Sequence, residues 1–214
     1  MKKNLNSENK KRMAKIIPIL AVQFPDAWIV LEYENPFELL VSTILSAQCT
    51  DERVNKVTES LFKKYRYPED YLKVPVEELE NDIFSTGFYK AKAKNIRAMV
   101  NMLNEKFNGQ VPGTMDELTS LPGVGRKTAN VVLGHCFNTP GIVVDTHVSR
   151  LANRIGFVQT QDAVKIEFAL MELVPKNLWT KFTHYLISLG RNVCQAKKPM
   201  CYECRISELC PKII

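Results

Sequence analysis

The sequence predicts an all-α protein, and three features of its 214 residues support that prediction. Apolar residues recur at the spacing of a buried helix face, most clearly at Phe37, Leu40, Val41, Ile44 and Leu45. Short proline or glycine stretches separate the helical segments. The one strand-like run, Ile142 to Val144, is too short to build a sheet. We expect roughly ten short helices.

The same spacing predicts further helices along the chain. Their apolar stripes are Val54, Val57, Thr58, Leu61 and Phe62; Ile96, Met99, Val100 and Leu103; and, more loosely, Ile166, Phe168, Leu170, Met171 and Leu173. The separating stretches are Tyr67-Pro68, Val74-Pro75, Asn108-Gly109, Thr139-Pro140-Gly141 and Val174-Pro175. The stretch at residues 139–141 is the expected domain boundary.

The charge distribution suits a polyanionic partner. The net charge is +6 and the pI is about 8.9, which permits such a partner without requiring one. Acidic residues gather at 69–82, whereas basic residues gather at 1–15 and at Lys90, Lys92, Lys94 and Arg97. One basic side is typical of nucleic-acid-binding proteins, although each charged run alone is more often a solvated helix face.

The sequence predicts a protein without membrane association. No apolar run approaches the roughly 18 residues that a membrane span needs, and the charged N-terminus lacks the apolar core of a signal peptide. We therefore expect a reducing compartment, the cytoplasm, where structural disulfides are rare. The six cysteines then need another explanation, and four of them lie near the C-terminus.

The stretch LPGVGRKTA, residues 121–129, predicts a helix–hairpin–helix. A capping box, Thr114 followed by Glu117, begins the first helix, and Pro122 cannot continue it. The second helix begins near Arg126, and its apolar stripe is Ala129, Val132, Leu133 and Cys136.

The glycines of this hairpin predict a site for phosphate. Backbone N–H groups near Gly123 and Gly125 lie at a helix N-terminus, where the helix dipole is positive. Glycine has no Cβ to obstruct a phosphate, and a contact of this kind reads no base sequence. An ordinary tight αα turn is the alternative, but the basic residues that follow the glycines favour DNA binding.

Lys127 and Asp145 are candidates for chemistry. Lys127 lies in the first turn of the second helix, where the dipole opposes a cation and favours the neutral amine that forms a Schiff base. The hairpin alone supports a phosphate contact by Lys127 equally well. Asp145 precedes a helix and fits an N-cap, the interpretation that it favours by itself, although a carboxylate so placed also suits acid–base or electrostatic work. His147 is expected to be structural.

The C-terminal cysteines predict a metal site. Cys194, Cys201, Cys204 and Cys210 form a C-x6-C-x2-C-x5-C pattern that suits zinc or an iron–sulfur cluster, and the spacing leaves the metal open. Lys197 and Lys198 lie between the first two cysteines, on a loop that suits a phosphate contact. Cys49 and Cys136 lie on apolar patterns and are expected to be small core residues.

Together these motifs resemble the endonuclease III family of DNA glycosylases. The matching segments, spread from about Met13 to Cys210, are LLVSTILSAQCTD, LPGVGRKTANVVL, VDTHVSRLANR, LGRNVC and the four cysteines. The resemblance implies a [4Fe–4S] cluster on those cysteines. It also implies two helical domains: a barrel at 29–139 that holds the hairpin at about 115–136, and a cluster domain of 1–28 with 140–214.

The resemblance assigns roles to individual residues. Lys127 matches the Schiff-base nucleophile and Asp145 the essential aspartate. The expected DNA contacts are Gln48, which fills the gap left by a flipped nucleotide, Phe88, Gly123, Gly125, Arg191, Lys197 and Lys198. Two positions depart from the family pattern: Phe88 stands where a leucine wedge is common, and Leu189 where histidine is frequent.

The implied function is base excision repair by a monomer acting on double-stranded DNA that contains damaged pyrimidines or abasic sites. A damaged base is flipped out, the N-glycosidic bond is cleaved through a lysine Schiff base, and β-elimination cleaves the abasic site. One alternative is a mismatch-specific adenine glycosylase of the same superfamily, which normally lacks a lysine at position 127. A second alternative is a non-catalytic DNA-binding module.

Overall fold

The structure is a computed structural model that describes residues 2–213, with side chains from Asn6 onward. The described residues form eleven α-helices and three short 3-10 helices without a strand, which confirms the all-α prediction. Ile142 to Val144 belong to an irregular segment. No described helix is both long and apolar enough to cross a membrane. Lys2 and Lys3, part of the basic N-terminal run, have side chains outside the described residues.

The chain divides into two compact units, a terminal unit of Met1–Ile29 with Pro140–Ile214 and a central unit of Val30–Thr139. The helices of the central unit are α2 (Pro36–Leu45), α3 (Asp51–Lys64), α4 (Asp70–Lys73), α5 (Val76–Asp82), η1 (Phe84–Thr86), α6 (Tyr89–Phe107), α7 (Met115–Ser120) and α8 (Arg126–Cys136). The helices of the terminal unit are α1 (Lys2–Gln23), α9 (Thr146–Arg154), α10 (Ala163–Leu173), η2 (Lys176–Leu178), α11 (Trp179–Asn192) and η3 (Ser207–Leu209).

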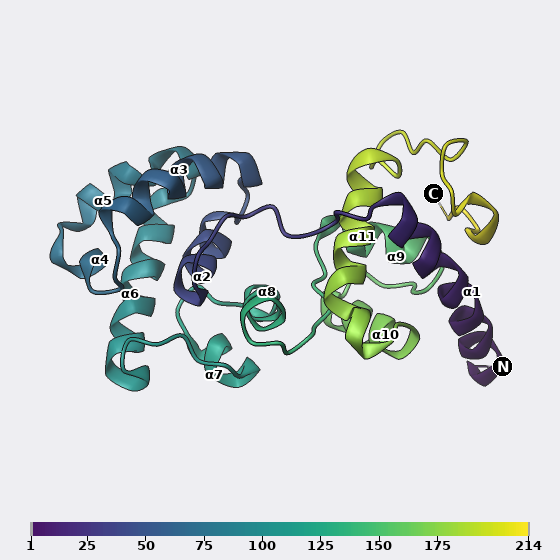
Figure 1. Ribbon diagram of the computed structural model, residues 1–214, viewed down its shortest axis with the longest axis horizontal. Helices are drawn as coiled ribbons and strands as arrows, with labels where there is room; N and C mark the ends of the chain where they lie inside the picture. Colours follow the sequence, from purple (N-terminus) through teal and green to yellow (C-terminus); the bar gives the residue numbers. More distant parts are fainter. Residues whose placement is uncertain (1, 214) are drawn as a thin grey trace. The chain divides into compact units, whose positions relative to one another are not determined.

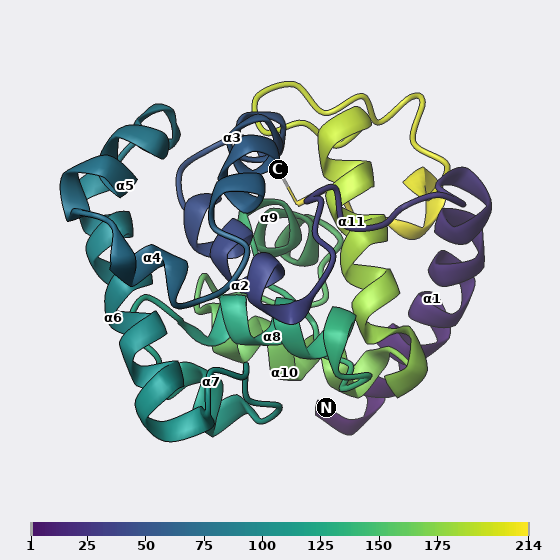
Figure 2. The same ribbon diagram turned by 60° about the vertical axis from the view of Figure 1, so that its left-hand side comes forward.

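The central unit is built around α2, which packs against α3, α6 and α8 (Figures 1 and 2). Nearly every side chain of α2 from Phe37 to Leu45 is buried. A helix that is apolar on all sides must be covered on all sides, so α2 fixes the positions of its neighbours. The predicted stripes on α3 and α6 face the same core, although Phe62 is only partly buried.

The terminal unit joins the two ends of the chain. Helix α1 packs against α10 and α11, and α9 packs against α11. Met13, Ile16 and Leu20 of α1 share one buried cluster with Leu151 of α9 and Leu186 of α11. Residues from both ends of the chain therefore form a single apolar core.

Three apolar assignments from the sequence need correction. Cys49 and Cys136 are only partly buried, so the prediction that both are core residues was wrong. Helix α2 already ends at Leu45, which leaves Cys49 in the turn beyond it, and Cys136 is the last residue of α8. Phe168 lies on α10 but is 51% exposed, because the loose apolar spacing of this helix turns it away from the core.

Helix α7 begins where the capping signal predicts. The hydroxyl oxygen of Thr114 accepts the backbone N–H of Glu117 at 3.3 Å, and its O–H donates to the Glu117 carboxylate at 2.6 Å. The N-cap bond pairs one of the amide groups that every helix leaves unpaired at its start. This short helix leads directly into the hairpin.

We predict that Thr114→Ala lowers the free energy of unfolding by about 1 kcal/mol, because the first turn of α7 loses its cap. Urea denaturation followed by circular dichroism measures the change. Thr119→Ala is the matched control: Thr119 is exposed and its hydroxyl bonds only within the helix, to the carbonyls of Met115 and Asp116. Equal losses in the two variants would contradict a capping role for Thr114.

Candidate functional site

The turn between α7 and α8 is shaped by Gly123. The Val124 N–H donates to the Leu121 carbonyl at 3.1 Å, and Gly123 has a φ of 78°. A Cβ on Gly123 would lie 2.8 Å from the Cβ of Asn95 on α6. The left-handed backbone and the close approach to α6 therefore both require glycine at this position.

The N-terminus of α8 has no side-chain cap, a feature that it shares with α6 and α11 among the longer helices in the described part of the chain. Side chains cap α2, α3, α7, α9 and α10, through Asn35, Thr50, Thr114, Asp145 and Asp162. Gly125 at the N-cap of α8 provides no such bond, and the first turn holds no acidic residue. Gly125 is exposed, and a Cβ there would meet nothing within 4 Å. The first-turn amides and the dipole are thus available to an anion from solvent.

Lys127 is the second residue of α8 and is exposed. Among the described residues, its ammonium makes no hydrogen bond or ion pair with a side chain or carbonyl. Arg126 beside it is partly buried and does have an interaction partner. The structure therefore separates the two basic residues: Arg126 is tied to the protein, whereas Lys127 is available for an external group.

Asp145 begins α9 in the terminal unit. Its Oδ1 accepts the Val148 N–H at 2.8 Å, which confirms the N-cap prediction. The preceding segment is anchored because the Val143 N–H donates to the Thr183 hydroxyl at 3.1 Å. Within the described residues only Oδ1 accepts a hydrogen bond, so the cap leaves Oδ2 for other work.

His147 is held between α9 and α11, in agreement with a structural role. A Cβ on Gly190 would lie 2.7 Å from its Nδ1, and an Arg150 N–H points at the same nitrogen from 3.2 Å. Burial lowers the pKa of His147; Arg150 and Arg191 lower it further, while Asp145 opposes the shift. The resulting neutral ring can accept the Arg150 N–H.

Gln48 and Phe88 both project from turns at helix ends in the central unit. Their φ angles are 54° and 49°, in the left-handed region that non-glycine residues rarely adopt. Gln48 is exposed, and the Phe88 side chain is 66% exposed. Left-handed backbone at a non-glycine residue persists only where the surrounding structure holds it, and such residues often occur at functional sites.

Lys92 does not contribute to the basic surface that its sequence neighbours suggest. It is 4% exposed, and Arg97 nearby donates to the carbonyls of Tyr71 and Val74. Only Lys90 and Lys94 of that basic run are exposed. The spacing of Lys92 to the apolar stripe that starts at Ile96 was the signal that this lysine faces the core.

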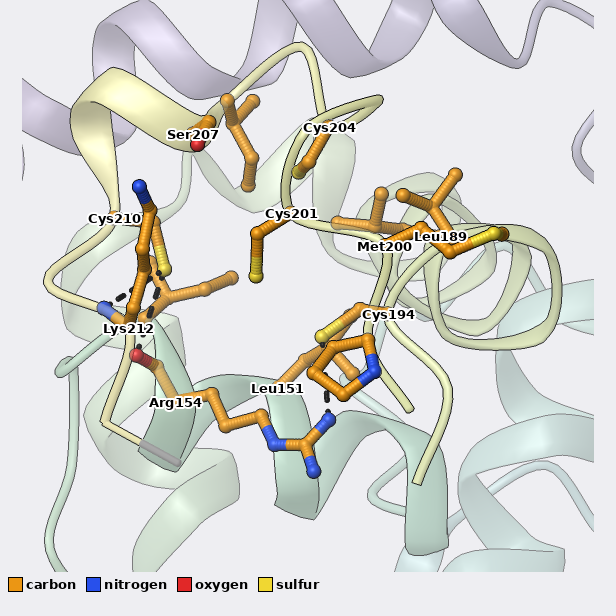
Figure 3. Close-up of a pocket in the computed structure, with 14 residues that line it drawn as sticks. Leu151, Arg154, Leu189, Cys194, Met200, Cys201, Cys204, Ser207, Cys210 and Lys212 are labelled. Atoms are coloured by element: carbon orange, nitrogen blue, oxygen red, sulfur yellow. Dashed lines mark hydrogen bonds between the residues drawn. The ribbon is translucent and has the colours of Figure 1, made fainter. Parts of the chain in front are cut away.

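The four C-terminal cysteines lie around one cavity of the terminal unit (Figure 3). Burial raises the pKa of Cys204 and Cys210, and the neighbouring cysteine thiolates raise it further. Thiols that repel one another on ionisation need a cationic centre to become thiolates together. No three His, Cys, Asp or Glu side chains in the described part of the chain are placed to hold a single metal ion.

Arg154 ties α9 to the cysteine loop. Its guanidinium donates to the carbonyls of Gln195 at 2.7 Å and Ala196 at 2.6 Å, and an N–H lies 3.5 Å from the Cys194 sulfur (Figure 3). These bonds anchor the start of the loop that carries Lys197 and Lys198, both of which are exposed. Arg191, at the end of α11, is exposed and has an interaction partner within the described chain.

The predicted site residues are divided between the two units. Lys127, Gln48, Phe88 and the hairpin glycines belong to the central unit. Asp145, Arg191, the loop lysines and the cysteines belong to the terminal unit. Within the central unit the predicted residues occupy the ends of α2, α6 and α8, and within the terminal unit the cysteines gather at one cavity.

The chain is similar to known DNA repair proteins. A family model described as the HhH-GPD superfamily of base excision DNA repair proteins matches residues 41–176. Endonuclease III of Synechocystis sp. is 48% identical over 206 residues, covering 96% of this chain and 94% of the relative. Endonuclease III of Bacillus subtilis is 49% identical over 203 residues, covering 94% of this chain and 93% of the relative.

Solved structures also match nearly the whole chain. A trapped endonuclease III–DNA covalent intermediate has a TM-score of 0.91 and 49% identity, covering 95% of this chain and 96% of that chain. A thermostable thymine-DNA glycosylase has a TM-score of 0.83 and 28% identity, covering 95% of this chain and 97% of that chain.

We predict that the two hairpin glycines respond differently to alanine. Gly123→Ala places a Cβ against Asn95 at a left-handed φ and lowers the free energy of unfolding by about 1–2 kcal/mol or more. Gly125 has a φ of −94°, which alanine adopts freely, so Gly125→Ala keeps its stability. The methyl group instead obstructs an approaching phosphate and weakens affinity for duplex DNA.

Urea denaturation measures the first effect of these substitutions, and fluorescence anisotropy with a labelled duplex at fixed salt measures the second. A Gly125→Ala variant with unchanged DNA affinity would contradict phosphate binding at the N-terminus of α8.

Proposed function

This chain belongs to the endonuclease III family, within the HhH-GPD superfamily of base excision DNA repair proteins, and we propose that it excises oxidised pyrimidines from duplex DNA and cleaves the resulting abasic strand. The position of Lys127 carries the proposal, as an exposed amine in the uncapped first turn of the hairpin helix. A neighbour in structure is an endonuclease III trapped as a covalent intermediate with DNA, and this supports a covalent mechanism.

Binding of DNA begins with phosphate contacts. The uncapped amides of α8 hold one backbone phosphate, and the exposed Lys197 and Lys198 hold another part of the backbone through a loop fixed by Arg154. Contacts of this kind position the duplex without reading its sequence, and their strength falls as salt rises. An enzyme that searches for damage at any sequence needs this property.

The damaged base must leave the helix before it can react, at a cost of about a few kcal/mol. We assign Gln48 to the gap that the base leaves, and Phe88 to the neighbouring base step. Both side chains are exposed on left-handed turns of the central unit. Phe88 is larger and flatter than a leucine wedge, and its ring can stack on the exposed base faces.

Lys127 then attacks the sugar. Its neutral amine forms a bond to C1′ while the glycosidic bond breaks, and the base leaves with the bonding electrons and a proton. Opening of the sugar ring gives a Schiff base between Nζ and C1′. The imine acidifies the C2′ proton, and loss of that proton expels the 3′ phosphate by β-elimination. One lysine thus serves both excision and strand cleavage.

Asp145 supports this reaction electrostatically. Its Oδ1 is committed to the cap of α9, so the carboxylate is held in a fixed orientation. We assign the remaining oxygen to stabilise positive charge on the sugar as the base departs, or to accept a proton from the amine. The negative charge, and not the cap, is the catalytic contribution.

The four cysteines fit a [4Fe–4S] cluster, and we propose that they hold one. Structural zinc sites usually use two close pairs of ligands, and only Cys201 and Cys204 form such a pair among the four cysteines that line the cavity. Four thiolates, one for each iron, suit the larger group. When bound, the cluster supplies a rigid cross-link for the loop that carries Lys197 and Lys198, with no redox step on the DNA.

We predict that borohydride traps the wild-type protein on abasic duplex DNA and that Lys127→Ala gives no trapped adduct, because the amine is absent. Gel mobility of a labelled duplex measures adduct formation. A wild type that binds DNA but is never trapped would identify a non-catalytic DNA-binding module. Excision of adenine from mismatches without a trapped adduct would identify the mismatch-specific alternative.

We predict that Asp145→Asn lowers single-turnover excision of thymine glycol by about 10²- to 10⁴-fold. Asparagine caps a helix as well as aspartate does, so the midpoint of thermal unfolding stays close to that of the wild type. The pair of measurements separates the charge from the cap. An active, stable Asp145→Asn protein would show that Asp145 serves only as the cap.

We predict that the purified protein is brown and contains iron and acid-labile sulfide in equal amounts. Cys201→Ser removes the colour and weakens affinity for duplex DNA, because the lysine loop loses its cross-link. Cys49→Ser, at a cysteine of the central unit, is the matched control and keeps both. A colourless protein that contains zinc and no iron would contradict the cluster.

A further inference from the structure

Lys92 is a buried cation at the junction of α2, η1 and α6. Its side chain projects from the first turn of α6 into the central unit and is 4% exposed. Nζ donates to the Leu45 carbonyl at 2.8 Å and to the Thr86 carbonyl at 2.8 Å. A lysine this buried is rare unless its nitrogen is paired, and here both bonds go to the backbone.

The two carbonyls belong to the ends of two helices. Leu45 is the last residue of α2, and Thr86 is the last residue of η1. Carbonyls at a helix C-terminus lack a partner within the helix and carry the negative end of its dipole. A single ammonium group therefore satisfies both ends and joins them to each other through one atom.

The chain turns sharply immediately beyond each end. Gln48, three residues beyond Leu45, has a φ of 54°, and Phe88, two residues beyond Thr86, has a φ of 49°. Left-handed backbone at non-glycine residues persists only where the surrounding structure holds it. Lys92 bonds to a carbonyl just before each turn. Because one nitrogen makes both bonds, displacement of either turn strains the bond that holds the other.

We propose that Lys92 is a positioning residue that fixes the Gln48 and Phe88 turns relative to each other. The two side chains then enter the duplex at a constant separation. The inference rests on the proposed function, since it concerns the residues assigned to the gap and to the base step. Insertion of two side chains at one lesion needs a fixed separation between them. The shared nitrogen supplies that separation.

The chemistry of lysine suits this role. Burial lowers the pKa of Lys92, and the charge of a Cys49 thiolate opposes that shift. The ammonium form and the neutral amine both carry at least two N–H donors, so the link survives in either state. A methionine of similar length fills the space but donates to neither carbonyl.

The test compares two reactions of Lys92→Met. In single-turnover excision of thymine glycol from duplex DNA, Gln48 and Phe88 must enter the stack, and we expect the rate to fall by roughly ten- to a hundred-fold. Single-stranded abasic DNA has no gap and no opposite strand to fill. Borohydride trapping on that substrate depends on Lys127, and we expect a yield within about two-fold of the wild type.

Three controls separate loss of the Lys92 hydrogen bonds from loss of charge. Lys94→Met removes the same charge from an exposed position of α6 and leaves the duplex-to-single-strand ratio unchanged. Lys92→Gln retains an amide donor and restores part of the duplex rate. In a double mutant, the losses from Lys92→Met and Gln48→Ala do not multiply, because Lys92 acts through Gln48.

Each outcome is decisive. Equal losses on both substrates would reduce Lys92 to a general stability role, and an unchanged duplex rate would remove it from catalysis. If Lys92→Met loses its helical circular dichroism, Lys92→Gln is judged by the same ratio. Failure of the wild type to form an adduct on either substrate would instead overturn the proposed function, which keeps the two failures distinguishable.

Discussion

The pairing of backbone groups at helix ends is the constraint on which the structure depends. Most helices in the described chain are short, so a large share of their amides and carbonyls lie within four residues of an end and lack a partner in the helix. Buried backbone groups of this kind must be paired. Lys92 and Asp145 pair backbone groups at helix ends, whereas Gly125 leaves those of α8 without a side-chain partner. The proposed chemistry rests on these three residues.

The same constraint explains why the N-terminus of α8 suits a ligand. Asn35, Thr50 and Asp162 pair amides at the starts of α2, α3 and α10 with their own oxygens. Gly125 has no side chain to do so, and the amides of α8 therefore await an acceptor from outside. In the proposed function, a backbone phosphate provides the missing acceptor, and its charge is stabilised by the helix dipole. The same proposal brings an amine of that first turn, Lys127, close to the sugar–phosphate chain.

The sequence predicts those parts of the structure that depend on neighbouring residues. Thr114, Pro122 and Gly123 act within one turn of the chain, so the helix–hairpin–helix was read from them directly. Long-range contacts left weaker signals. Lys92 was assigned to a basic surface, because local charge counting does not register a carbonyl 47 residues earlier. Cys49 was assigned to the core, because the apolar pattern of α2 does not reveal that the helix ends at Leu45.

Cations that donate to main-chain carbonyls connect these observations. Lys92 and Arg97 donate to main-chain carbonyls of the central unit, and Arg150 and Arg154 to those of the terminal unit. Part of the net charge of +6 is therefore bound to the protein's own backbone. A sum over the sequence therefore overstates the field that attracts DNA. The compensation lies in geometry, because Arg154 holds the loop from which the exposed Lys197 and Lys198 face outward. In the proposed function, exposed lysines thus attract the duplex, whereas the lysine and arginine residues that bond to the backbone keep the site rigid.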